Sequence, residues 1–321
     1  MSAIKEYKIF YTSDLHGSDL CFRKALDATV HYEATALLIG GDLAGKSLTK
    51  IIKKANGKYE AVVAGRKERA ASGTELEEMR DAIANSGSYS IILSEEEFDC
   101  TAEDKEWHEK QILSLITRRL QQWLWLAELK LKPRGIRLII ICGNDDPWSL
   151  DKILRHSSFA EDPEYQPVIF GDNHQVLGES AGNLPSPFVC PRDMEEEQLK
   201  ERMGKKVAQL TDVGSAIFML HIPPYNSTLD LAYELDRELR IKTEGTGFLQ
   251  QPVGSKAVRA IIEEQQPLIA LHGHIHESPG TTQIGRTLCF NPGSDHHHGL
   301  MRGFLITLDR DQVKGHATIT G

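Results

Sequence analysis

Leu268-Ile-Ala-Leu-His-Gly-His-Ile-His276 is a short apolar run that passes directly into three closely spaced histidines. The apolar run is typical of a buried strand over residues 268–271. Alternate residues of an extended segment can both reach one metal ion if the backbone bends, so His274 and His276 are candidate metal ligands. His272 lies next to the apolar run and is expected to belong to the core.

Four other apolar runs end in the same way, with side chains that can bind a metal directly after the run. These runs and the residues after them are Lys8–Tyr11 with Asp14 and His16, Ala36–Ile39 with Asp42, Arg137–Cys142 with Asn144 and Asp145, and Ala216–Leu220 with His221. Each motif by itself is more often a turn or a helix cap. In open α/β sheets, however, ligand sites lie outside the carboxyl ends of the strands. We therefore expect the five strand ends to converge on one site.

Helical patterns alternate with the apolar runs, which indicates a sheet covered by helices. The expected strands are 8–11, 36–39, 137–142, 167–170, 216–220, 268–271, 287–290 and 303–308. The expected helices are 20–30, 47–55, 74–85, 103–131, 195–210, 228–239 and 255–265. The wide apolar stripe of the helix over 103–131 predicts that it packs on the sheet. The late strands alternate less regularly with helices and are expected to pair antiparallel.

Composition excludes several classes of protein. The 321 residues include 37 Lys and Arg, 46 Asp and Glu and 40% hydrophobic residues, which is typical of a globular protein with a net charge of −9. An acidic balance argues against an extended nucleic-acid-binding surface. No apolar run approaches the ~20 residues of a membrane helix, and residues 1–8 lack the apolar stretch of a leader. The five cysteines form no Cys-x-x-Cys motif. We expect a cytoplasmic protein that does not bind membranes.

An acidic segment interrupts the alternating pattern. Residues 55–110 hold 14 acidic and 7 basic side chains, so most of the net charge of the chain is local to this segment. Charge runs usually form solvated faces. We expect residues 45–110 to form an acidic, partly helical insertion on the surface of a single domain that spans residues 1–321.

The candidate ligands combine imidazole nitrogens with carboxylate and amide oxygens and include no thiolate. They are Asp14, His16, Asp42, Asn144, His221, His274 and His276. Such a mixed set suits manganese, iron, cobalt or zinc, and of these we favour manganese, with magnesium as a further alternative. Seven ligands are too many for one tetrahedral ion, whereas two divalent ions that share a carboxylate use all of them.

The ordered set Asp-x-His, Gly-Asp, Gly-Asn, His and Gly-His-x-His closely resembles the calcineurin-like metallophosphoesterase superfamily, from residue 8 to about residue 308 outside the acidic insertion. The segment 268–278, followed by Asn291-Pro-Gly-Ser294, is similar to bacterial and archaeal phosphoesterases of this group. The resemblance implies a four-layer α/β/β/α sandwich and a dinuclear metal-dependent phosphoesterase. It also implies that Asp14, His16 and His276 hold the first metal, that Asn144, His221 and His274 hold the second, and that Asp42 bridges the two. A hydroxide between the ions would then attack phosphorus.

The sequence departs from the family pattern at one position. Many members read Gly-Asn-His-Asp/Glu, and their histidine helps to protonate the leaving group, whereas this chain reads Gly143-Asn-Asp-Asp146. A carboxylate beside two cations is ionised and is a poor general acid. General acid catalysis contributes ~10²–10⁴-fold, so its loss would weaken turnover, least for leaving groups of low pKa. We therefore favour a phosphodiester over a monoester substrate, and we expect Asp42, Asn144, Asp145 and His274 to be catalytic.

Two other functions remain open. A non-hydrolysing protein-interaction module of the same fold could lose metal positions, whereas this chain retains every expected one. A metal-dependent nuclease is the third reading, although the acidic balance fits a nucleotide-sized substrate better than extended nucleic acid. The expected partner is a small phosphate ester, nucleotides included, and the sequence leaves the oligomeric state open. One of His296–His298 could contact a substrate phosphate, but exposed loop histidines are the usual case.

Overall fold

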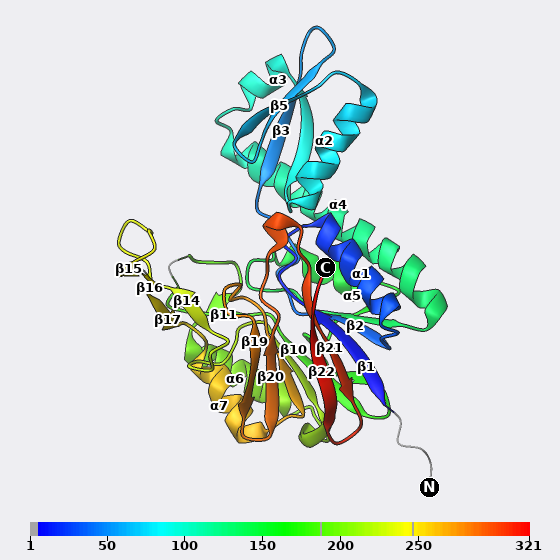
Figure 1. Ribbon diagram of the computed structural model, residues 1–321, viewed down its shortest axis with the longest axis vertical. Helices are drawn as coiled ribbons and strands as arrows, with labels where there is room; N and C mark the ends of the chain where they lie inside the picture. Colours follow the sequence, from blue (N-terminus) through cyan, green and yellow to red (C-terminus); the bar gives the residue numbers. More distant parts are fainter. Residues whose placement is uncertain (1–5, 187, 246) are drawn as a thin grey trace.

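The computed structural model describes residues 6–186, 188–245 and 247–321, and two six-stranded sheets lie at its centre (Figure 1). The first sheet contains, in spatial order, β22 (Val313–Thr320), β21 (Arg302–Leu308), β1 (Tyr7–Thr12), β2 (Ala36–Ile39), β7 (Arg137–Ile140) and β8 (Ala160–Glu161). The second contains β19 (Gly280–Ile284), β20 (Thr287–Asn291), β18 (Ile269–Leu271), β13 (Ile217–Leu220), β10 (His174–Glu179) and β9 (Val168–Phe170).

Helices cover the outer face of each sheet. The helices α1 (Asp19–His31), α4 (Lys105–Leu131) and α5 (Ser149–Arg155) pack on the first sheet, and α6 (Glu196–Val207) and α7 (Lys256–Gln265) pack on the second. Between the sheets lies a third apolar layer to which strands of both contribute. The expected four-layer α/β/β/α sandwich is therefore confirmed, as is the packing of the long helix α4 on the sheet.

The central strands β2, β13 and β18 are apolar throughout because both of their faces are buried. In β1, Phe10 packs against the helices, whereas its neighbours Ile9 and Tyr11 pack against the second sheet. β1, β2 and β7 pair in parallel, and so do β10, β13, β18 and β20. The late strands pair antiparallel, as expected, in β19–β20, β21–β22 and β1–β21. Parallel pairing brings the carboxyl ends of the central strands to one edge.

Two expected helices are wrong. Residues 47–55 contain β3 (Leu48–Lys53), whose apolar residues fit a helical and an extended pattern equally well. Pairing of β3 with strands on both sides decides in favour of the strand. Residues 228–239 contain only the short strand β14 (Leu231–Tyr233), and Leu239 is exposed. The sequence patterns also miss β10, β19, β22 and α5.

The acidic insertion contains a sheet in addition to helices and projects from the sandwich at the top of Figure 1. Its strands lie in the order β5 (Arg66–Ala70), β4 (Tyr59–Val63), β3 and β6 (Tyr89–Ser94), and its helices are α2 (Gly73–Asn85) and α3 (Glu95–Cys100). A separate apolar cluster that includes Ile51, Leu76 and Ile83 holds these elements together. Tyr89 instead packs into the core of the sandwich, and its hydroxyl accepts a hydrogen bond of 3.1 Å from the Gly45 N–H.

Short elements complete the described chain. They are the strand pairs β11 (Gly182–Asn183) with β12 (Asp193–Met194), β14 with β17 (Gln250–Pro252), and β15 (Thr243–Glu244) with β16 (Gly247–Phe248), and the 3-10 helices Lys132–Arg134, Val213–Ser215 and His296–His298. None of the helices within the described ranges has the length and hydropathy needed to cross a bilayer. The prediction about a leader falls largely on residues 1–5, which lie outside the described residues.

A buried hydrogen bond joins the two sheets and gives a testable prediction. The Tyr11 hydroxyl at the end of β1 donates to the His272 carbonyl after β18 at 2.7 Å. Tyr11→Phe would leave that carbonyl without its partner, so we expect the free energy of unfolding to fall by about 1–3 kcal/mol. Urea unfolding of the variant measures this change.

Tyr59→Phe is the matched control, because among the described residues the Tyr59 hydroxyl makes no hydrogen bond and its ring packs on the core of the insertion. Its free energy of unfolding should change by less than about 0.5 kcal/mol. Equal stability of the two variants would contradict a role for the Tyr11 hydrogen bond.

Candidate metal centre

The structure brings all seven expected ligands to one edge of the sandwich. Asp14 and His16 follow β1, Asp42 follows β2, Asn144 follows β7, His221 follows β13, and His274 and His276 follow β18. The strands that carry them belong to both sheets, so the site lies where the carboxyl ends of the two sheets meet. It is therefore held by the most deeply buried part of the fold.

One group of side chains forms around His16. Its Nε2 lies 3.0 Å from Nε2 of His276 and 3.6 Å from Oδ2 of Asp42. Oδ1 of Asp14 lies 3.4 Å from Nε2 of His276. Ligand atoms of Asp14, His16 and Asp42 all fall within 4.8 Å of one another, a spacing that can hold a metal ion. We call this group the first half of the centre.

A second group forms on the other side of Asp42. Oδ1 of Asp42 lies 3.4 Å from Nε2 of His221, and Oδ1 of Asn144 lies 3.1 Å from that nitrogen and 2.9 Å from Nδ1 of His274. The other ring nitrogen of His221, Nδ1, donates to the Gly40 carbonyl at 2.8 Å, which leaves Nε2 free to ligate. This group is the second half of the centre, and Asp42 turns one oxygen toward each half.

The backbone of the centre is strained. Asp14, His16, Asp42 and His274 adopt positive φ angles of 56°, 41°, 49° and 65°. Such conformations cost of order 1–3 kcal/mol each for residues other than glycine and gather at functional sites. Four of the seven expected ligands therefore hold a conformation that only the surrounding packing enforces.

The donor set fits divalent cations. Oδ2 of Asp14 is buried and has no hydrogen-bond partner within the described part of the chain. An unpaired buried carboxylate oxygen is costly unless a cation pairs with it. The amide oxygen of Asn144 lies close to ring nitrogens of both His221 and His274, so three possible ligand atoms of the second half lie together. Imidazole nitrogens with carboxylate and amide oxygens suit borderline divalent metals.

The carboxylates of the centre stay ionised. Burial disfavours the charged form of Asp14, but the imidazoles of His276 and His221 outweigh burial and lower its pKa to about 2. Burial likewise opposes ionisation of Asp42, and His221 and His16 hold its pKa well below the ordinary range. Burial opposes protonation of His221, yet Asp42 raises the pKa of this imidazole to about 10. A divalent cation would replace the proton that balances these carboxylates.

Two carboxylates that sequence patterns missed support the ligands. The fully buried Asp146 accepts hydrogen bonds from the N–H groups of Leu43 (3.0 Å), Ala44 (2.8 Å) and Gly143 (2.8 Å), and so joins the loops that carry Asp42 and Asn144. Burial, with the charge of Asp42, raises the pKa of Asp146 to about 6. Asp193 accepts from Nδ2 of Asn144 at 2.9 Å, which turns the amide oxygen toward the centre.

Asp145 has two partners that its motif does not reveal. Lys46 forms an ion pair with its carboxylate, and the Cys190 thiol donates to Oδ1 of Asp145 at 2.7 Å. Burial, reinforced by Asp145, raises the pKa of Cys190 to about 12, so the thiol keeps its proton. The Asp145 N–H donates to Oδ1 of Asp42 at 3.0 Å, which ties this residue to the bridge between the halves.

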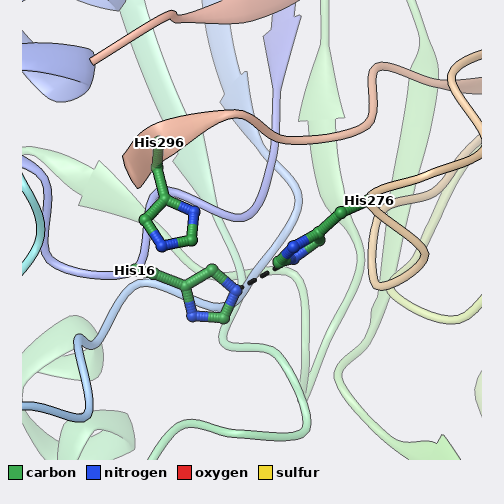
Figure 2. A group of neighbouring side chains, drawn as sticks. All are labelled: His16, His276 and His296. Atoms are coloured by element: carbon green, nitrogen blue, oxygen red, sulfur yellow. Dashed lines mark hydrogen bonds between the residues drawn. The ribbon is translucent and has the colours of Figure 1, made fainter. Parts of the chain in front are cut away.

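His296 lies beside the first half of the centre, and the expectation of an exposed loop position is wrong for this residue. Its side chain is buried, and its ring centroid lies 4.7 Å from that of His16 (Figure 2). His297 and His298, the next residues, are exposed as expected. The close turn that follows Asn291-Pro-Gly-Ser294 carries His296 back over the site, a path that local sequence does not indicate.

Comparisons with known proteins support the fold. No family model matches the chain. The uncharacterized protein MJ1162 of Methanocaldococcus jannaschii is 32% identical over 113 residues, which is 35% of this chain and only 44% of that relative. The crystal structure of TT1561 of Thermus thermophilus superposes with a TM-score of 0.51 at 13% identity over 99% of both chains. Another crystal structure gives a TM-score of 0.54 at 16% identity, again over 99% of both chains.

At these identities the solved structures bear on the fold alone. They agree with a mixed α/β sandwich, and the described residues place the metal-competent side chains at its strand ends in the order noted in the sequence. The chain thus has the four-layer α/β/β/α sandwich that its resemblance to the calcineurin-like metallophosphoesterases implies, and its metal-competent residues lie at the strand ends of that sandwich.

Proposed function

We propose that this chain is a dinuclear metal-dependent phosphoesterase that hydrolyses a small phosphate ester, with a phosphodiester favoured. The observation that carries the proposal is the position of Asp42, whose Oδ2 faces His16 and whose Oδ1 faces His221. A single carboxylate between two sets of imidazoles is the arrangement that two neighbouring cations require. Asp14, His16 and His276 would hold one ion, and Asn144, His221 and His274 the other.

Two divalent cations at this centre would supply an activated hydroxide and would carry the charge that develops on the phosphoryl oxygens. The chain itself orients the ligand side chains. Asp193 fixes the Asn144 amide, Gly40 fixes the His221 ring, and the Asp145 N–H holds the Asp42 carboxylate. Because these partners are in place, the ligands need no rearrangement to receive the ions.

The preference for a diester rests on the surroundings of Asp145. Its carboxylate pairs with Lys46 and accepts from Cys190, so it is held as a hydrogen-bond acceptor and is poorly placed to donate to a departing alkoxide. A substrate whose leaving group is stable as an anion depends least on such a proton. The catalytic residues in this proposal are Asp42, Asn144, His274 and, through its N–H, Asp145.

The metal, the size of the substrate and the cellular compartment are proposed from the ligand atoms, the net charge and the cysteines. The donor set favours manganese, with iron, zinc, cobalt or magnesium as alternatives. The net charge of −9 fits a nucleotide-sized substrate better than extended nucleic acid. All five cysteines are free, which suits the cytoplasm. We treat residues 1–321 as one domain with the acidic insertion, residues 45–110, within it.

Asp42→Asn tests the shared carboxylate. The amide retains the shape of the side chain but loses the charge, so we expect both metal ions to bind at least about 100-fold more weakly. Titration calorimetry with Mn²⁺ and metal analysis after desalting should show two equivalents in the unaltered protein and fewer than one in the variant.

Asp311→Asn is the matched control, because it removes the same charge at an exposed position outside the centre. It should bind two equivalents with unaltered affinity. Unchanged metal content and activity in Asp42→Asn would remove the proposal. Two bound equivalents without any esterase activity would instead favour a non-hydrolysing protein-interaction module.

A panel of nitrophenyl esters tests the substrate class. With Mn²⁺ bound, we expect kcat/KM for the bis-nitrophenyl diester to exceed that for the nitrophenyl monoester. Both esters release nitrophenolate, which departs without a proton, so the ratio reports the substrate class independently of the leaving group. A steady-state assay of both esters, together with cyclic nucleotides, measures the ratio. Faster turnover of the monoester would contradict the diester preference.

Asp145→His tests the role of the departure from the family motif. An imidazole at this position could protonate a leaving group, a contribution typically worth ~10²–10⁴-fold where protonation limits the rate. We expect kcat for esters with poor leaving groups to rise by at least about tenfold, while nitrophenyl esters change little. Asp145→Asn is the control, since it removes the charge without adding an acid. Equal rates for the two variants on poor leaving groups would contradict this role.

A further inference from the structure

We propose that His296 is an additional ligand of the first metal ion, so that this ion is held by three imidazoles together with Asp14 and Asp42. The inference rests on the proposed metal centre and adds a ligand that the ordered motifs do not contain. One nitrogen from each of His16, His276 and His296 lies within 4.8 Å of the others. Figure 2 shows the three rings converging from three separate segments of the chain.

The ring of His296 lies deep in the first half of the centre. Its side chain is only 5% exposed, and its centroid lies 4.7 Å from that of His16 and 5.8 Å from that of His276. The 3-10 helix that carries it exposes the next two histidines to solvent. Of these three consecutive histidines, only His296 is buried and lies beside the centre.

Hydrogen bonds around Ser294 determine which nitrogen of His296 is free. The Ser294 hydroxyl donates its single hydrogen to the Asp14 carbonyl at 2.7 Å. The same oxygen lies 3.1 Å from Nδ1 of His296, so it accepts from that nitrogen. Nδ1 therefore carries the ring hydrogen and Nε2 carries the lone pair. Nε2 has no hydrogen-bond partner in the described chain, which leaves it available to an ion.

Packing behind the ring keeps it in this position. The 86–88 turn of the acidic insertion lies against the back of the site, where a Cβ on Gly87 would come within 3.4 Å of Cδ2 of His296 and 2.3 Å of the His16 carbonyl oxygen. On another side, the ring of His297 lies 3.8 Å from that of His296, centroid to centroid. The imidazole thus has little room to turn away from the centre.

A third imidazole would make the two metal positions unequal. The first ion would have three nitrogen and two carboxylate ligands, whereas the second would have two imidazoles, the Asn144 oxygen and the shared carboxylate. Nitrogen-rich sites favour iron, cobalt, nickel or zinc over manganese and magnesium. The first position should therefore bind such a metal more tightly, and the second should keep more room for a phosphoryl oxygen.

The test compares His296→Ala with His298→Ala, whose side chain is 78% exposed and belongs to the same short helix. Metal-free proteins are titrated calorimetrically with Mn²⁺ and with Co²⁺, and the visible absorption of bound Co²⁺ is recorded. In His296→Ala we expect one of two binding steps to weaken by about 10–100-fold and the Co²⁺ spectrum to change. His298→Ala should match the unaltered protein in both measurements.

Thermal unfolding of the metal-free variants checks that each is folded. If His296→Ala does not fold, His296→Gln replaces it, because glutamine retains a hydrogen-bond donor toward Ser294. Unchanged affinity and an unchanged Co²⁺ spectrum would overturn the inference. Intact metal binding in His296→Ala together with weaker inhibition by inorganic phosphate would also overturn the inference, because His296 would then contact the substrate and not the metal ion. If the unaltered protein binds no cation, the proposed function itself fails, an outcome distinct from both.

Discussion

The Asp42 carboxylate has to face two groups of imidazoles at once, and the loops around it are built to meet this constraint. Its neighbours approach so closely that side chains are excluded. A Cβ on Gly143 would lie 2.2 Å from Oδ1 of Asp42, and one on Gly41, whose φ is 111°, would lie 2.6 Å from Nδ1 of His221. Glycine is therefore required at positions 41 and 143, because a side chain there would collide with the His221 ring or with the Asp42 carboxylate.

The same constraint explains why the centre needs a deeply buried support. Left-handed backbone at Asp14, His16, Asp42 and His274 persists only where packing over-determines it. The parallel strands supply that packing, since their residues are apolar on both faces and their ends are fixed in register. Asp146 adds a polar tie, because one carboxylate accepts from the loops after β2 and after β7.

Sequence patterns predicted a sheet covered by helices and the seven converging side chains because both depend on local signals, whereas the second sheet of the sandwich was implied only by the family resemblance. A buried strand is a run of apolar residues, and a ligand at its carboxyl end stands next to that run. Sequence patterns failed where pairing between distant segments decides the structure. The residues of β3 are compatible with a helix, and only their pairing with β4 and β6 makes them a strand. The same patterns named His296 only as a loop histidine and did not place it beside the centre, and they missed the contacts of Lys46 and Cys190 with Asp145, because these positions depend on segments that are distant in sequence.

The acidic insertion lies at the back of the centre. Gly45 and Gly87 meet there without room for a side chain, since a Cβ on Gly45 would lie 1.8 Å from the Gly87 carbonyl oxygen. The turn that carries Gly87 also covers the His16 backbone and the edge of the His296 ring. A shortened chain in which residues 46–104 were replaced by a brief linker would lose this wall, and water would reach the first half of the centre from behind. The insertion is thus a structural boundary of the candidate metal centre, and its length cannot be varied as freely as that of an ordinary surface loop.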